Sequence, residues 1–167
     1  AGKRGVQILM TDLVPVLALG ENGFSFRKGN YDPRLPYQGA WKPKKHFFPV
    51  VGDLKDKGEE YECAIEIDSH PSVRHWVRNV DRTKGAYWLP TSSDRFYPDF
   101  IAELNDGRIL VIEYKGANLS DTGDSREKKN IGKRLQEISG GEVLFLLAEK
   151  KNAHGTLNLQ IDPILQT

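Results

Sequence analysis

The 167-residue sequence predicts an α/β (α+β) fold in which helices flank a mixed β-sheet. Three observations support this prediction: helical periodicity over 59–68, two apolar runs joined by a turn over 96–115, and a helical pattern followed by a continuous apolar run over 124–148. From residue 59 the expected order is two helices, three strands, a helix and a strand. Such a succession is typical of a sheet with helices packed on it.

The first 50 residues form an N-terminal segment of mixed or irregular structure, which we expect to pack on a core built by residues 51–167. Within it, Val6–Leu19 fits either a strand or a helix. Residues 30–49 are dense in proline, glycine and aromatic side chains. Because disordered tails are poor in aromatics, this composition indicates an ordered irregular segment with short strands.

Two helices are expected next. Glu59–Asp68 has apolar residues on neighbouring turns, and Ser69-His70-Pro71 interrupts it. Ser72–Val80 is predicted as an amphipathic helix, because its large apolar residues recur at i, i+3, i+4 and i+7. Arg78 and Asn79 are expected to fix the end of that helix, and Ala86–Leu89 to form a short strand.

A hairpin follows, with strands at Phe96–Leu104 and Arg108–Lys115 around Asn105-Asp106-Gly107. A two-residue turn would place Asp99 and Glu113 on opposite faces of the sheet. A three-residue loop places them directly opposite each other on one face, because side chains alternate along a strand. We expect the three-residue loop, since glycine is the residue that its left-handed third position favours.

The remaining elements are a helix and two strands. Asp124 and Glu127 have capping-box spacing, so the helix is expected to start there and to run to about Ser139 before two glycines. Val143–Ala148 is a continuous apolar run, as in a buried strand. Leu157–Ile161 is interpreted as an edge strand.

Composition limits the class of protein. The net charge is +1, so any nucleic-acid surface must be a local patch. Cys63 is the only cysteine, which excludes an internal disulfide and favours a reducing compartment such as the cytoplasm. No segment has the apolar length of a membrane span. The start at Ala1 rather than methionine suggests processing or an excised fragment.

Asp99, Glu113 and Lys115 are unexpected charges in an otherwise apolar pair of strands. Two adjacent carboxylates repel and raise each other's pKa unless a positive charge joins them. A hard divalent cation such as Mg²⁺ fits this need, and the carbonyl of Tyr114 can complete its oxygen shell. With Lys115 next on the same face, the constellation suits phosphodiester hydrolysis.

At these residues the chain resembles the PD-(D/E)xK nuclease superfamily, through "YPDF" and "EYK". It resembles more closely the C-terminal endonuclease domain of type III restriction enzyme Res-like subunits, through "ECAIEIDSHPSVRHWVRN" and "RFYPDF…VIEYKG". The resemblance implies a restriction-endonuclease-like αβββαβ core. It also implies Asp99 and Glu113 as metal ligands and Lys115 as the catalytic lysine. Glu62, on the preceding helix, is implied as a further catalytic acid that binds the metal directly or through water, with Glu66 as its competitor.

The resemblance further implies a Mg²⁺-dependent endonuclease acting on double-stranded DNA, with Mn²⁺ able to substitute. In such systems a translocating ATPase precedes the domain in the parent chain, and a separate modification subunit chooses the sequence. No G-x-x-x-x-G-K-[ST] motif occurs here, so the motor is absent from this chain. The alternative is a catalytically silent DNA-binding or assembly module on a nuclease scaffold.

Two basic stretches are candidates for phosphate contact. The later helix carries Arg126, Lys128, Lys129 and Lys133, which are either DNA contacts or part of a solvated face. A second stretch, Lys42–His46, is either a further DNA contact or a surface strand. The four histidines show no ligand spacing with acids or Cys63, so zinc is not expected.

Overall fold

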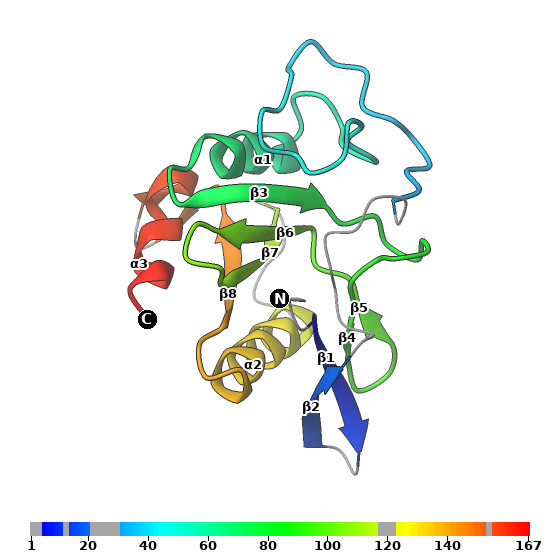
Figure 1. The fold of residues 1–167 in the computed structure, drawn as a ribbon, viewed down its shortest axis with the longest axis vertical. Coiled ribbons are helices and arrows are strands. Elements are labelled where there is room, and N and C mark those ends of the chain that lie inside the picture. The colour runs from blue at the N-terminus through cyan, green and yellow to red at the C-terminus, as the bar shows by residue number, and fades with distance from the viewer. Residues whose placement is uncertain (1–4, 12–13, 21–30, 117–122, 153–154) are drawn as a thin grey trace.

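A four-stranded mixed sheet forms the centre of the protein (Figure 1). The structure, a computed structural model, describes residues 5–11, 14–20, 31–116, 123–152 and 155–167. The strands stand in the order β3 (Val73–Arg78), β6 (Phe100–Leu104), β7 (Ile109–Lys115) and β8 (Val143–Glu149). The first two pairs are antiparallel, and β7 pairs with β8 in parallel. A parallel pair needs a long crossover, which the connection containing α2 (Gly123–Ile138) provides.

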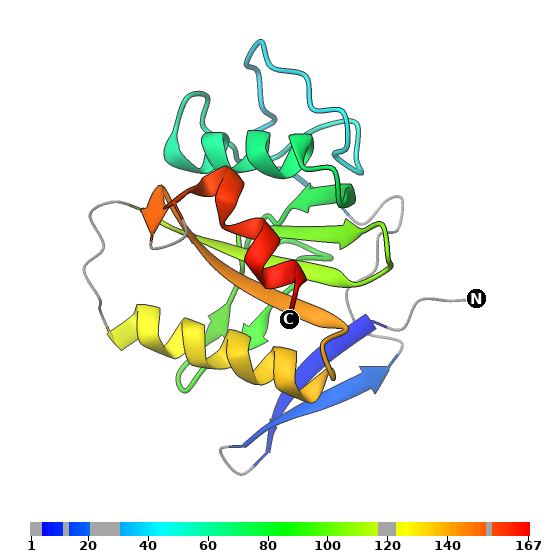
Figure 2. The same cartoon turned by 90° about the vertical axis from the view of Figure 1, so that its left-hand side faces the viewer.

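Helices cover both faces of this sheet, so that α1 and α2 lie on opposite sides of it in Figure 1. On one face α1 (Glu59–Ser69) and the C-terminal α3 (Ile161–Leu165) bury a large apolar cluster that includes Trp76 and Phe100. On the other face α2 packs with a short ribbon of β4 (Leu89–Pro90) and β5 (Arg95–Phe96). Figure 2 shows the same layers from the side. The expected mixed sheet flanked by helices is confirmed at this level.

The hairpin between β6 and β7 has the three-residue loop that the sequence predicted. Ile101 pairs with Val111, and Leu104 donates its N–H to the Arg108 carbonyl at 2.9 Å. Gly107 has a φ of 91°, which glycine adopts without the steric cost that a Cβ imposes. This register places Asp99 opposite Glu113, at the end of the sheet where β6 begins and β7 ends.

The prediction of a helix over Ser72–Val80 is wrong, because this segment is strand β3. Its apolar residues fit a helical face, but they also fit a strand buried on both sides: Trp76 packs towards α1, and the neighbouring Val77 is buried as well. The three strands that the chain between α1 and α2 contributes to the four-stranded sheet are therefore β3, β6 and β7. The expected strand at Ala86–Leu89 overlaps only the two-residue β4.

The prediction of an edge strand at Leu157–Ile161 is also wrong. The chain forms a short ribbon of β9 (Lys151–Asn152) and β10 (Gly155–Thr156), a 3₁₀ turn at Leu157–Leu159, and then α3. The buried Gln160 side chain explains the difference. It accepts the Glu149 N–H at 3.0 Å and donates to the Glu149 carbonyl at 2.6 Å, so a side chain replaces a strand at this edge.

The N-terminal region supplies a hairpin and an irregular segment. The strand-or-helix alternative at Val6–Leu19 resolves as β1 (Gly5–Thr11) paired with β2 (Val14–Gly20). Residues 31–58 contain isolated bridges in place of the short strands expected there. One of these bridges lies along β3, where Phe47 donates its N–H to the Trp76 carbonyl at 2.8 Å. None of the helices in the described part of the chain has the length and apolar character to cross a membrane.

Candidate functional site

Asp99 and Glu113 meet at the end of the β6–β7 hairpin. The Asp99 charge lies close enough to raise the pKa of Glu113, and the Tyr114 N–H donates to Asp99 Oδ2 at 2.8 Å. Asp99 lies just before β6, after Pro98, where the chain enters the sheet. The hairpin thus brings together the two carboxylates that the sequence analysis singled out.

Glu113 is an acid in an unfavourable environment. It is 8% exposed, and burial together with the Asp99 charge raises its pKa to about 8, against the opposing effect of Lys128. Lys128 of α2 donates to Glu113 Oε1 at 2.8 Å. Glu113 Oε2 is buried, and the described residues give it no hydrogen-bond partner. A buried carboxylate oxygen without a partner costs free energy, so this atom needs an explanation.

Arg78 of β3 supports the pair from the α1 side. Its guanidinium donates to Asp99 Oδ1 at 2.8 Å and to the Asp99 carbonyl at 2.9 Å, and it bonds Glu60 at 2.5 Å. Burial, followed by the Asp99 charge, raises the pKa of Glu60 against the effect of Arg78. Glu60 is therefore the acid of α1 linked to the pair, whereas Glu62 is exposed to solvent.

Lys115 occupies the next position on the Glu113 face of β7, but its Nζ lies 3.5 Å from Glu149 Oε1. The ammonium that contacts Glu113 comes instead from Lys128, which also pairs with Asp124 at 3.2 Å. Burial lowers the pKa of Lys128, but the hydrogen bond to Glu113 and the charge of Glu113 outweigh this effect, so the pKa of Lys128 is raised. The arrangement neutralises Glu113 with a residue from α2.

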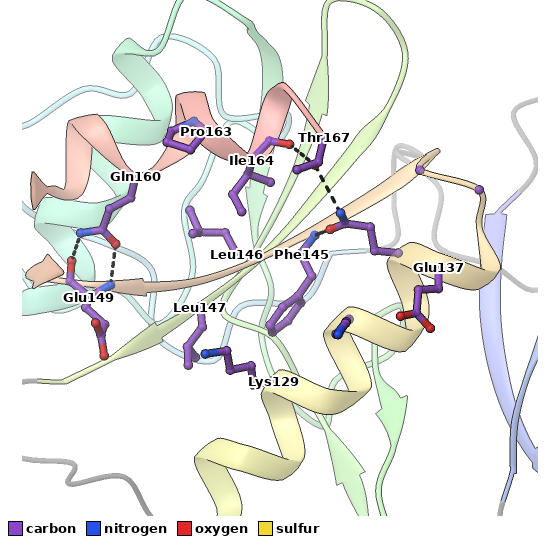
Figure 3. A pocket seen from close by; sticks show the side chains of 14 residues that line it. Lys129, Glu137, Phe145, Leu146, Leu147, Glu149, Gln160, Pro163, Ile164 and Thr167 are labelled. Carbon is purple, nitrogen blue, oxygen red and sulfur yellow. Dashed lines mark hydrogen bonds between the residues drawn. The ribbon is translucent and has the colours of Figure 1, made fainter. Parts of the chain in front are cut away.

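The four basic residues expected at the DNA do not act as one group. Lys128 lines a cleft of about 420 Å³ that also holds Asp99 and Arg78. Lys129 and Lys133 line a different pocket, between α2, β8 and α3 (Figure 3), and Arg126 is exposed. The structure therefore separates Lys128 from the other three.

The donor set at the pair fits a hard divalent cation. Asp99 and Glu113 bring carboxylate oxygens together, and the unsatisfied Glu113 Oε2 is the kind of atom that such an ion would engage. Within the described ranges no three histidine, cysteine, aspartate or glutamate side chains form a ready-made cage. Mg²⁺, which keeps several waters and binds through one or two carboxylates, needs no cage of that kind.

The roles of Arg78 and Glu60 and the position of Lys128 were not among the sequence-based expectations. Arg78 was expected at a helix end, because β3 was interpreted as a helix. Lys128 carried a usable signal: it follows Asp124 by four residues on a predicted helix beside the motif strand. Comparisons with protein-family models, with curated proteins and with solved structures find no match to this chain.

Proposed function

We propose that the chain is a metal-dependent DNA endonuclease domain with the PD-(D/E)xK arrangement. The observation that supports this best is the closeness of the Asp99 charge to the buried Glu113, whose Oε2 is left without a described partner. Two like charges kept together at the end of a sheet destabilise the fold, so a function at this position explains them better than packing does. The core order α1-β3-β6-β7-α2-β8 agrees with the restriction-endonuclease-like αβββαβ arrangement.

In this proposal each residue has a separate task. Asp99, Glu113 and the Tyr114 carbonyl would hold Mg²⁺ or Mn²⁺, which would supply polarisation of the phosphate and a lower pKa for a bound water. Arg78 fixes the Asp99 side chain through Oδ1. Lys115 leaves Glu149 and stabilises the charge that develops on the phosphate. Until a cation binds, the ammonium group of Lys128 compensates the negative charge of Glu113.

The same resemblance suggests the larger enzyme to which this domain would belong. We propose the nuclease part of a type III restriction-like helicase/nuclease in a prokaryotic cytoplasm. Its partners are double-stranded DNA, an ATPase/translocase portion of the parent chain, and a modification subunit that supplies sequence choice. Glu60, rather than Glu62, takes the role of the acidic residue on α1, because only Glu60 is tied to Asp99 through Arg78.

A second candidate function is a catalytically silent DNA-binding or assembly module. The observation that favours it is that Arg78 and Lys128 already pair with the two carboxylates, while Lys115 pairs with Glu149. In such a module the protein's own cations replace the metal permanently.

Plasmid cutting in Mg²⁺ or Mn²⁺ separates the two candidates. The nuclease proposal expects the unaltered chain to cut, and expects Asp99→Ala and Lys115→Ala to abolish cutting with the fold and most DNA binding retained. Glu137→Ala is the control, because Glu137 is an exposed acid that pairs with Arg134. Cutting by purified Asp99→Ala at the unaltered rate would remove the nuclease proposal, and a chain that binds DNA without cutting it supports the silent module.

A further inference from the structure

A hollow beside the candidate cleft carries two arginines and two aromatic rings. Arg82, Trp88, Arg95 and Tyr97 line it, and we call these four residues the ribbon hollow, since the last three flank or belong to the β4–β5 ribbon. Arg82, Arg95 and Tyr97 also line the cleft that contains Asp99. The hollow therefore opens directly from the candidate site.

Arg95 is held in a conformation suited to phosphate. Its guanidinium carbon lies 4.3 Å from the centroid of the Trp88 ring, and the side chain is exposed. The described residues supply no hydrogen-bond or ion-pair partner to this guanidinium. The contact with the ring restrains the guanidinium without using its N–H donors in a hydrogen bond to the described residues. A fixed planar fork of donors matches the oxygens of a phosphate.

Arg82 lies across the same hollow with its donors only weakly engaged. Its side chain is 69% exposed, and its nitrogens lie 3.9 Å from Asp81 and 3.5 Å from Asp94. Both distances exceed those of a normal hydrogen bond. Asp81 has a closer partner in Arg34, at 2.5 Å. Arg82 can therefore turn to an incoming anion without breaking a strong contact.

The buried Asn79 side chain ties the hollow rigidly to the carboxylate pair. Its Nδ2 donates to the carbonyls of Tyr87 and Pro98, both at 2.8 Å, and its Oδ1 accepts the Tyr87 N–H at 2.9 Å. Tyr87 precedes Trp88, and Pro98 precedes Asp99. One side chain thus fixes the spacing between the hollow and the site, and such preorganisation lowers the cost of binding a ligand across both.

We propose that the ribbon hollow binds the phosphodiester backbone of a nucleic acid, one or a few nucleotides from the bond that is cut. The position relative to the cut bond rests on the proposed function, whereas the binding itself does not. The electrostatics favour this occupant. The cleft around Asp99 is rich in carboxylates, whereas among the described residues that line the hollow Asp94 is the one acid, with Asp81 beside Arg82 at its margin. A polyanion leaving the cleft reaches cations there.

The test is DNA binding without divalent metal, so that no cutting is needed for the readout. In EDTA, Arg82→Ala/Arg95→Ala is expected to weaken binding of a short fluorescent duplex about tenfold or more, and to reduce the salt slope of binding by about two. The control Lys55→Ala/Lys150→Ala removes the same charge from exposed positions that line neither the cleft nor the hollow, and is expected to change affinity less than about threefold. Circular dichroism checks the fold of each variant.

Equal losses in both double variants, or no loss in the hollow variant, overturn the proposal. If Arg82→Ala/Arg95→Ala does not fold, the single Arg82→Ala variant decides, because that side chain is mostly exposed. A duplex RNA of the same sequence tells which nucleic acid supplies the backbone. If the unaltered chain binds through the hollow but never cuts DNA with Mg²⁺ or Mn²⁺, the proposed function fails and this inference stands.

Discussion

Glu113 shows at the scale of one residue how a functional arrangement weakens a fold. Its carboxylate is buried, adjacent to Asp99, and only half satisfied by Lys128. The ionised form is therefore less stable in the folded chain than in the unfolded chain, where water solvates it. A bound divalent cation would reverse this balance.

The variant Glu113→Gln tests that balance. The folded pKa of about 8 lies above the usual value for glutamate, so stability falls as pH rises from about 4.5 to 8. Without divalent metal, Glu113→Gln is expected to be more stable than the unaltered chain at pH 8, by on the order of 2 kcal/mol, and similar to it at pH 4.5. Urea unfolding at the two pH values measures the difference.

The same variant makes a second comparison possible. Mn²⁺ is expected to raise the melting temperature of the unaltered chain and to leave that of Glu113→Gln unchanged, because the amide is a weaker ligand. The Glu137→Ala variant, with an acid removed far from the pair, should keep the Mn²⁺ response. A Glu113→Gln chain that is less stable at pH 8, or that keeps the full Mn²⁺ shift, contradicts this interpretation of the site.

Single residues differ in how well the sequence predicts them. Asp99 and Glu113 were predictable as a pair, because a local feature, the three-residue loop ending at Gly107, sets their register. Arg78 and Lys128 reach the pair from β3 and α2, and the geometry between such distant elements depends on packing of the whole sheet. Lys115 shares the predicted face, but its partner Glu149 lies on β8, and the hairpin alone carries no information about that strand.

At the scale of elements, close packing of α2 on β8 depends on Gly132. A Cβ built there would lie 2.0 Å from the ring of the buried Phe145. Gly132→Ala is therefore expected to destabilise the chain by about 1–3 kcal/mol, in spite of alanine's better helix propensity. Chemical denaturation measures this cost.

Gly123 provides the matched control on the same helix. No atom of the described residues lies within 4 Å of a Cβ built at Gly123, so Gly123→Ala is expected to be neutral or slightly stabilising. Equal effects of the two substitutions would show that α2 does not pack on β8 as described.

The segment over 72–80 shows why one element was misassigned. Val73, Trp76, Val77 and Val80 fit a helical period. All four are buried, but the first three belong to strand β3, and a strand that is covered on both faces produces the same apolar pattern as a helix. Hydrogen bonding to neighbouring segments makes this segment a strand. Arg78 lies opposite Phe100 of β6, and on the other edge of β3 the Trp76 N–H donates to the Lys45 carbonyl. These partners are distant in sequence, so the local pattern could not choose between the two.

At the scale of the whole molecule, His46 joins the N-terminal segment to the sheet. Its Nε2 accepts the Arg78 N–H at 3.1 Å, so Nδ1 carries the proton that is donated to the Phe48 carbonyl at 2.8 Å. Burial lowers the pKa of His46 to about 4, a shift that the Asp68 charge opposes. A neutral imidazole is thus part of the folded structure.

This arrangement predicts a pH dependence of stability. Below about pH 6.5 His46 becomes protonated in the unfolded chain, but in the folded chain it stays neutral until about pH 4. The free energy of unfolding is therefore highest above about pH 6.5 and decreases as the pH falls from about 6.5 to about 4. The expected loss is on the order of 3 kcal/mol. Urea denaturation from pH 7 to pH 4 measures it. His46→Phe should be less stable at pH 7, but the slope of its free energy of unfolding against pH, between about pH 4 and about pH 6.5, should be smaller by about one proton. An unchanged slope would argue against a neutral His46 ring in the folded chain.

The most direct test of the account is a crystal structure of the chain with Mn²⁺ and anomalous diffraction data. An anomalous peak is expected between the carboxylates of Asp99 and Glu113, with Lys128 moved away from Glu113 Oε1. An empty site at saturating Mn²⁺, with Arg78 and Lys128 still paired to the two acids, would contradict it.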